Sequence, residues 1–462
     1  MSTPKIQDVF LQKILNDYVE FLRFKSVSTD ITFKEPLHNC ADWVEKKLRA
    51  CSLDVQRWEA PAKEHPPILF AGTKSKSQDS KTKPTWIIYH HYDVQPASLE
   101  DGWDSDPFEP KIEGDRIFAR GAQDNKGQCL ATLVALEKLY HDFGSSENWP
   151  INVKVLVEGQ EESGSEFLSS ILSEKKKELS CDGWVLIDID IPSMQDPTVT
   201  LGMRGMLAID IELAEGFSDK HSGLHGNLAY NTNRAMSELL ASFYEENGKV
   251  AIEGFYDNVR YPSEAERASI DLSFDENAYK TNFGVLPLGG WTEHCPVERL
   301  WFDPSLEING MQGGYSAEGF KTVIPCKSIA KISCRIAAGQ DPKAVLLAIK
   351  AHVDKNIPAS IKATIKEHAG SALAVQSDSS CTIAQSFARA ISEQRQATTR
   401  FVFSGASIPI AQKLQALENA PLIGIGFGLP TDRIHGPNEH FDLSRIVALS
   451  EAIYHALSTP VL

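Results

Sequence analysis

The chain has 462 residues, of which 42% are apolar and 23% charged, so it can form two or three domains and is too apolar for a disordered protein. Lys and Arg number 46 against 62 Asp and Glu, and the resulting net charge of −16 argues against nucleic acid or an anionic membrane as a partner. The eight cysteines include no C-x-x-C pair, which argues against a structural zinc site and favours unpaired, buried thiols.

The first 24 residues predict an amphipathic helix rather than a signal peptide. Apolar side chains recur at helical spacing from Val9 to Leu22, and no basic segment precedes a continuous apolar run. No stretch approaches the roughly 18 apolar residues that a membrane-spanning helix needs. We therefore expect a cytoplasmic protein.

Helix and strand patterns alternate through residues 1–191. Strand-like apolar runs lie at residues 67–71, 86–89, 151–157 and 184–191, and helical patterns at 39–50 and 128–140. This alternation predicts an α/β domain with a mostly parallel sheet covered by helices. Residues 74–83 are rich in Lys and Ser and predict an exposed loop.

The pattern changes after Gly202. Residues 206–213 alternate apolar and polar side chains, as in a strand with one wet face. Further strands are expected at 322–325, 330–337 and 359–367, helices at 233–244 and 343–353, and irregular chain at 250–305. We interpret residues 204–373 as an α+β domain inserted into a first domain that comprises 1–203 and 374–462.

The predicted strand at residues 86–89 leads to a candidate metal ligand. His91 and Asp93 are two residues apart, so on an extended chain they face the same way. A His beside a carboxylate suits a metal ligand and the partner that fixes its ring. The alternative is a hydrogen-bonded pair at the surface.

Three further segments carry acidic residues that are candidates for the same site. Asp124 lies on a Gly-flanked turn before a helix, from which a carboxylate can reach a crevice at the sheet edge. Glu161 and Glu162 follow the strand at 151–157, so one can bind metal while the other faces a water; the alternative is a pair that favours a helix N-terminus. Asp188 and Asp190 alternate with large apolar residues, where a carboxylate is costly unless it is paired or metal-bound.

Several motifs in this order resemble a family of metallopeptidases. They are YHHYDVQP (89–96), ARGAQDNKG (119–127), EGQEESGS (158–165), GMRG (202–205), HSGLHG (221–226), SGASIP (404–409) and HGPNEH (435–440). The chain resembles the co-catalytic metallopeptidases of the acetylornithine deacetylase, glutamate carboxypeptidase and carnosinase type, closest to the cytosolic dipeptidase branch.

The resemblance implies two divalent metal ions per chain, zinc or manganese. The ligands would be His91 and Asp188 for one ion, Glu162 and His435 for the other, and Asp124 as a bridge. Three carboxylates and two imidazoles suit either metal better than a thiolate-selective one. Two ions about 3.5–4 Å apart activate a water and polarise a carbonyl.

The resemblance also implies roles for five other residues. Asp93 would orient His91, and Glu161 would be the general base that later protonates the leaving amine. His221 of the inserted domain would act in the partner subunit of a homodimer. Arg335, with Ser407 near it, would bind the carboxylate of the substrate.

The expected reaction is hydrolysis of the amide bond in dipeptides or short peptides with a free C-terminal carboxylate. Two alternatives remain: a deacylase or deacetylase of N-acyl amino acids that uses the same site, and a catalytically inactive ligand-binding protein. The inserted domain would serve as a lid and dimerisation domain.

Three points depart from the family pattern or stay open. His90 stands where the family commonly has glycine; the period of two turns it away from His91, although an imidazole close to the metal is the alternative. The SGASIP loop differs from the usual family sequence, which leaves the substrate side chains open. Asp188 is chosen over Asp190 for its spacing from Arg204.

Overall fold

The structure, a computed structural model, describes residues 6–62, 65–74 and 83–461. The chain forms two compact units. The first comprises Met1–Gly202, Ser377–Val402 and Lys413–Leu462, and the second comprises Met203–Gln376 and Phe403–Gln412. Residues 75–82 of the predicted loop lie outside the described residues.

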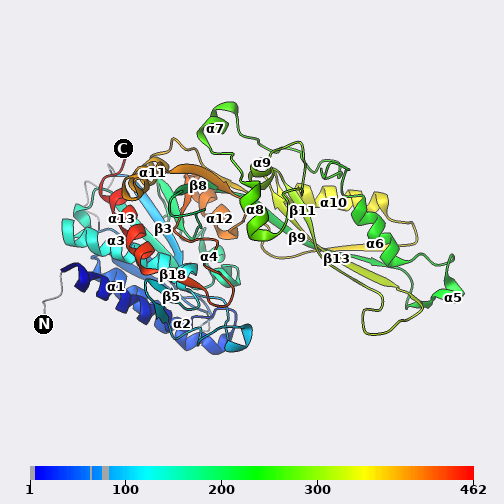
Figure 1. Cartoon of the computed structure of the whole chain (residues 1–462), viewed down its shortest axis with the longest axis horizontal. Helices are drawn as coiled ribbons and strands as arrows, with labels where there is room; N and C mark the ends of the chain where they lie inside the picture. The colour runs from blue at the N-terminus through cyan, green and yellow to red at the C-terminus, as the bar shows by residue number, and fades with distance from the viewer. Residues whose placement is uncertain (1–5, 63–64, 75–82, 462) are drawn as a thin grey trace. The chain divides into compact units, whose positions relative to one another are not determined.

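A twisted sheet forms the centre of the first unit (Figure 1). Seven strands that belong to this unit run in the order β1-β2-β6-β3-β7-β17-β8, and β16 also pairs with β8. Their bounds are β1 Asp54–Trp58, β2 Ile68–Gly72, β6 Asn152–Glu158, β3 Thr85–His91, β7 Gly183–Ile187, β17 Leu422–Ile425 and β8 Thr198–Met203. The central strands β6, β3, β7 and β17 are parallel, whereas β1, β2 and β8 pair antiparallel. The prediction of a mostly parallel α/β sheet is confirmed.

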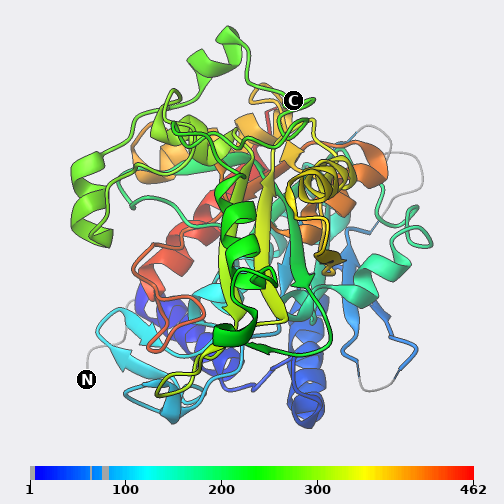
Figure 2. The same ribbon diagram turned by 90° about the vertical axis from the view of Figure 1, so that its right-hand side faces the viewer.

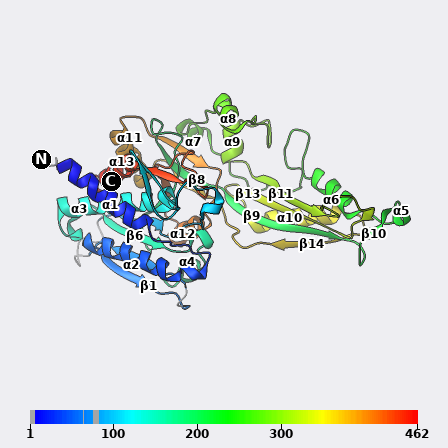
Figure 3. The ribbon, with the colours of Figure 1, turned by 60° about the horizontal axis from the view of Figure 1, so that its bottom comes forward.

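Helices surround this sheet, as Figure 3 shows for α1, α2, α3 and α13. The helices are α1 Ile6–Leu22, α2 Lys34–Ala50, α3 Gln128–Phe143, α4 Glu166–Ile171, α11 Thr382–Arg395, α12 Pro409–Glu418 and α13 Leu443–Ser458. A small sheet joins β4 (Lys111–Glu113), β5 (Arg116–Phe118) and β18 (His440–Asp442). The strand β16 spans Arg400–Ser404.

The second unit is built on an antiparallel sheet with the order β11-β13-β9-β14. The strands are β9 Gly205–Ala214, β11 Ser305–Gly313, β13 Lys327–Ile336 and β14 Lys362–Glu367. On β9 buried and partly buried residues alternate, as the sequence predicts. The buried face packs on α6 (Thr232–Ala241) and α10 (Pro342–Asn356), which lie along one side of the sheet in Figure 2.

Short elements occupy the rest of the second unit. They are β10 Lys220–His221, α5 Ser222–His225, α7 Glu264–Ser269, α8 Glu276–Phe283, α9 Pro296–Trp301, β12 Val323–Ile324 and β15 Val375–Gln376. Residues 250–305, expected to be irregular, therefore contain three short helices. Both segments of this unit interrupt the first unit along the chain, and the second segment, Phe403–Gln412, lies within the range 374–462 that we assigned to the first domain. The unit has the expected α+β composition.

Two smaller expectations need correction. The strand predicted at residues 184–191 ends at Ile187, so Asp188 and Asp190 lie beyond it. All eight cysteines are unpaired, but only Cys40, Cys51, Cys129 and Cys334 are buried. Among the described residues, no helix has the length and apolar character that crossing a bilayer requires.

Candidate metal centre

The parallel strands β6, β3 and β7 end together at one edge of the first unit's sheet. In their register His91 lies opposite Glu158, and Tyr89 lies opposite Leu186. The residues that follow these strand ends therefore lie near one another. This is the edge where open α/β sheets usually bind ligands.

A turn before α3 carries Asp124 to the same edge. A π-helical turn, Ala122–Gly127, follows Gly121, whose φ of 82° is a left-handed conformation that few side chains tolerate. A Cβ at Gly121 would also lie 2.6 Å from Cγ1 of Val94, so glycine is required by space as well. The turn thus presents Asp124 beside the end of β3.

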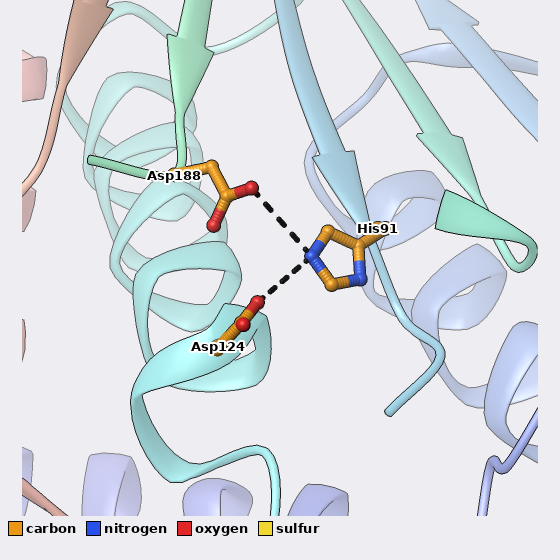
Figure 4. A group of neighbouring side chains, drawn as sticks. All are labelled: His91, Asp124 and Asp188. Carbon is orange, nitrogen blue, oxygen red and sulfur yellow. Dashed lines mark hydrogen bonds and ion pairs between the residues drawn. The ribbon is translucent and has the colours of Figure 1, made fainter. Parts of the chain in front are cut away.

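The first group of candidate ligands consists of His91, Asp124 and Asp188 (Figure 4). The Nε2 atom of His91 lies 3.0 Å from Oδ1 of Asp124 and 3.7 Å from Oδ2 of Asp188. His91 is fully buried, and the two aspartates are partly buried. Figure 4 shows both carboxylates directed at the same ring nitrogen.

The second group consists of Asp124, Glu162 and His435. The Nε2 atom of His435 lies 3.0 Å from Oδ2 of Asp124 and 3.3 Å from Oε2 of Glu162. The two oxygens of Asp124 thus face different imidazoles, and this carboxylate is common to both groups. Gln95 also donates to Oε2 of Glu162 at 2.6 Å, which helps to fix that side chain.

Asp93 holds the two groups in register. It is fully buried, and its Oδ1 atom lies 3.3 Å from Nδ1 of His91. The same carboxylate accepts the backbone N–H groups of Glu161 at 3.2 Å and Glu162 at 3.0 Å, and the hydroxyl of Ser28 at 2.6 Å. Asp93 therefore fixes the ring of His91 and the turn that carries both glutamates.

The imidazoles lie in a strongly negative environment. Burial favours a low pKa for His91, but hydrogen bonds with Asp124 and Asp93 hold its pKa well above the usual value. Hydrogen bonds with Asp124 and Glu162 raise the pKa of His435 to about 10. An excess of carboxylates stabilises positive charge at this place, and such an environment favours bound cations.

Two carboxyl groups close to these imidazoles have raised pKa values. Burial raises the pKa of Asp188 to about 7. Burial also raises the pKa of Glu161 to about 9, and the charges of Asp188, Asp93 and Glu162 act in the same direction. Carboxyl groups with pKa values raised in this way concentrate at functional sites.

The structure separates the two aspartates that follow β7. Asp188 joins the first group, and its Oδ1 accepts a hydrogen bond from Asn125 Nδ2 at 2.8 Å. Asp190 instead accepts from Nε2 of Gln123 at 2.8 Å and forms a backbone bridge with Gly428. The geometry thus favours Asp188 as the candidate ligand.

His90 faces away from the two ligand groups, as the strand period predicts. It is fully buried against α3 rather than directed outward, and burial lowers its pKa to about 3. Its ring nitrogens lie 2.8 Å from Oδ1 of Asn125 and 2.8 Å from Oγ1 of Thr132.

The other predicted site residues belong to the second unit. Arg335, on β13, donates to Oγ of Ser407 at 2.8 Å, and burial lowers its pKa. None of the ion pairs among the described residues involves Arg335. His221 is exposed, with Nδ1 accepting the N–H of Gly223 at 3.0 Å and Nε2 lying 3.4 Å from the hydroxyl of Thr322.

Sequence reasoning assigned no role to Glu439, although this buried residue holds the Asp124 turn. Its Oε1 accepts the N–H groups of Gln123 at 2.9 Å and Asp124 at 3.1 Å. Its Oε2 accepts from Gly121 N–H at 3.0 Å and Arg120 Nη1 at 2.7 Å. The available signal was its place in the HGPNEH motif, four residues after His435 (439 − 435).

Comparison with known proteins identifies the family. The model of peptidase family M20/M25/M40 matches residues 87–459, which include every ligand candidate described above. The chain belongs to this family. The prediction made from its motifs is confirmed.

Individual relatives resemble most of the chain. The Beta-Ala-His dipeptidase of Mus musculus is 30% identical over 386 residues, covering 81% of this chain and 76% of that protein. The Cys-Gly metallodipeptidase dug1 of Schizosaccharomyces pombe is 27% identical over 471 residues, covering 97% of this chain and 96% of that protein.

Solved structures of the M20 family share the fold. The dipeptidase Dug1p of Saccharomyces cerevisiae superposes with a TM-score of 0.78 at 25% identity, covering 98% of this chain and 96% of that one. The M20 metallo-carboxypeptidase Sso-CP2 of Sulfolobus solfataricus has a TM-score of 0.82 at 26% identity, covering 96% of this chain and 98% of that one.

Proposed function

We propose that this M20 chain is a dipeptidase that uses two divalent cations, zinc or manganese. The observation that carries the proposal is the geometry of Asp124, whose two oxygens each lie 3.0 Å from a different imidazole. One shared carboxylate between two ligand groups is the arrangement that a two-ion site needs.

The donor set fits such ions. The first would be held by His91 and Asp188, the second by Glu162 and His435, and both by Asp124. Oxygen and imidazole donors suit zinc and manganese, and thiolates are absent from both groups. When bound, the ions polarise a carbonyl and make a water more acidic.

Glu161 is the residue that would move the proton. It follows β6 immediately before Glu162, and its backbone is fixed by Asp93. Its side chain would take a proton from the attacking water and give it to the nitrogen of the leaving amine. Burial and the neighbouring carboxylates raise the pKa of this carboxyl, which makes the carboxylate a stronger proton acceptor.

Arg335 and Ser407 would bind the carboxylate end of the substrate. The Arg335 guanidinium is half-buried, hydrogen-bonded to a hydroxyl and without an ion pair among the described residues. A forked cation in this state suits a carboxylate from outside the chain. The dipeptidase names of the relatives support dipeptides as the substrate class.

A deacylase of N-acyl amino acids is the second candidate, because its substrates also carry a free carboxylate next to the scissile amide. The two candidates differ on the other side of that amide, where a dipeptide has a free amine and an N-acyl amino acid has none. Arg335 fits both kinds of substrate, so assays on dipeptides and on N-acyl amino acids must separate the two candidates.

We also propose that the chain acts as a homodimer in which His221 serves the partner subunit. Four large apolar side chains are strongly exposed in the second unit around the loop that carries His221: Phe217, Leu224, Leu228 and Phe320. Exposed apolar patches of this kind often mark interfaces.

The eight unpaired cysteines fit a reducing compartment such as the cytoplasm.

The test begins with metal stoichiometry. Protein treated with a chelator is titrated with Zn²⁺ or Mn²⁺, and bound metal is counted by mass spectrometry. Each loaded form is then assayed on dipeptides, on the same dipeptides with amidated C-termini, and on N-acetyl amino acids. Two ions per chain and preferred cleavage of free dipeptides support the proposal.

Other results assign the alternatives. Preferred cleavage of N-acetyl amino acids would identify a deacylase. Two bound ions without hydrolysis of any substrate would indicate a ligand-binding protein. Failure to bind metal would overturn the assignment of both ligand groups.

A further inference from the structure

A line of hydrogen bonds connects His90 to the candidate ligand Asp188. His90 Nδ1 lies 2.8 Å from Asn125 Oδ1, and Asn125 Nδ2 donates to Asp188 Oδ1 at 2.8 Å. His90 Nε2 lies 2.8 Å from Thr132 Oγ1 on α3. His90, Asn125 and Thr132 are all buried, so water does not replace these bonds.

The direction of these bonds follows from the acceptors at one end. Asn125 Nδ2 lies 2.7 Å from the carbonyl oxygen of Ile187, which can only accept. The amide nitrogen of Asn125 therefore faces Ile187 and Asp188, and its oxygen faces His90. Because that oxygen only accepts, Nδ1 of His90 must carry a hydrogen and donate it.

Asp188 depends on this support because it lies beyond the end of β7. The last sheet residue is Ile187, so strand pairing does not fix the side chain that follows. The Asn125 amide binds one oxygen of Asp188, and the other oxygen lies 3.7 Å from Nε2 of His91. One oxygen is thus held in place, and the other is left for a ligand.

We propose that His90 is a positioning residue for the ion held by His91 and Asp188, acting through the orientation of Asn125. This inference rests on the two-ion site proposed above. His90 touches neither ion nor substrate. Its donor fixes the Asn125 amide, and the amide fixes the carboxylate. Partners of metal ligands that act in this way typically change metal affinity 10–100-fold when they are removed.

A matched pair of substitutions tests whether His90 acts by donating a hydrogen bond to Asn125. In His90→Asn, the new amide nitrogen can take the place of Nδ1 and still donate to Asn125. In His90→Gln, the amide reaches the position of Nε2, beside Thr132, and the donor to Asn125 is lost. Both variants keep a buried polar side chain, and Gln is the closer match to His in size.

The measured quantity is the dissociation constant of each ion, from competition with a chromophoric chelator. We expect His90→Gln to raise the dissociation constant of one of the two ions about 10–100-fold and to leave that of the other ion within twofold of the wild type. We expect His90→Asn to bind both ions within about threefold of the wild type. A residue that only filled space would give the reverse order, since Gln fills the site better.

Thr132→Val supplies a second variant that keeps the shape of the side chain and removes its hydroxyl. It should weaken the binding of the same ion severalfold, because the ring of His90 loses a hydrogen bond. It therefore tests the role of His90 even if the His90 variants do not fold. Unchanged affinity for that ion in folded His90→Gln or, failing that variant, in Thr132→Val overturns the inference.

The wild type separates this result from the proposed function. If the wild type fails to bind two ions, the two-ion site is wrong. If the wild type binds two ions and hydrolyses dipeptides while His90→Gln binds both ions normally, only the role of His90 is wrong.

Discussion

Glu161 and Glu162 are adjacent in the chain but should respond differently to the same substitution. Glu161→Gln removes a proton acceptor and should keep both ions while turnover falls about 10²–10⁴-fold. Glu162→Gln removes a ligand of the second group and should lower metal occupancy. Metal content and kcat, measured on each variant, separate the roles.

The controls for this pair are internal. Each variant serves as the control for the other, because both lose one carboxylate from the same turn. Near-normal kcat in metal-loaded Glu161→Gln would remove Glu161 as the proton carrier. Full metal content in Glu162→Gln would show that the roles of the two glutamates are either exchanged or wrongly assigned.

Arg335 makes a prediction about the substrate. Arg335→Ala should reduce kcat/KM for dipeptides by a factor that corresponds to about 1.5–3 kcal/mol, because a charge-assisted hydrogen bond is lost. Dipeptides with an amidated C-terminus lack the matching charge and should be affected much less. The measurement is kcat/KM for each free and amidated pair.

Arg335→Lys is the matched control, since it keeps the charge and loses the fork. Its kcat/KM for free dipeptides should lie between the values of the wild type and of Arg335→Ala. Equal losses on free and amidated substrates would show that Arg335 supports β13 and Ser407 rather than the substrate.

At the scale of elements, the turn before α3 depends on a residue from the other end of the chain. Glu439 accepts four hydrogen bonds from Arg120–Asp124, and its ion pair with Arg120 is buried. Removing one partner of a buried ion pair costs about 3–5 kcal/mol. Glu439→Gln should therefore lower the free energy of unfolding by this amount and weaken both ions, since Asp124 serves both groups.

The exposed pair Arg23–Glu109 provides the comparison for this prediction. Its side chains are 55% and 60% exposed, so Glu109→Gln should cost less than about 1 kcal/mol and leave metal binding unchanged. Urea denaturation gives the two free energies. Loss of only one ion in Glu439→Gln would contradict a shared role of the turn.

Local patterns explain which parts of the site could be predicted. The apolar run before His91 predicts a buried strand, and its period of two separates His91 from His90. The same apolar character misplaced the end of β7, because hydrophobicity does not show that pairing with β3 stops at Leu186 and with β17 at Ile187.

Contacts between distant segments explain what could not be predicted. The residues bound by Glu439 lie 315 to 319 positions away in the sequence, so no local pattern reports them. The bonds of His90 likewise depend on how α3 packs against β3. The resemblance of motifs, rather than any periodicity, supplied the role proposed for His435.

At the scale of the whole molecule, His221 tests the proposed homodimer. Glu161→Gln and His221→Ala should each be nearly inactive, the second because an oxyanion donor typically contributes about 10²–10³ in kcat. If His221 acts in the partner subunit, mixed dimers contain one site with both residues intact. Mixing an excess of Glu161→Gln chains with His221→Ala chains should then restore activity.

The matched control replaces the second partner by a chain that carries both substitutions. Its mixture with Glu161→Gln has no site with an intact Glu161 and should stay inactive, while labelled chains report that subunits exchange. Exchange without recovery in the first mixture would show that His221 acts within its own chain or has no role.

The place of β17 in the sheet has a consequence for synthesis on the ribosome. This strand, Leu422–Ile425, lies between β7 and β8, yet it is translated after the whole second unit. Until residue 425 has left the ribosomal tunnel, the edges of β7 and β8 that later pair with β17 therefore stay unpaired. Unpaired strand edges invite aggregation, so nascent chains of this protein should depend on chaperones until their last strands arrive.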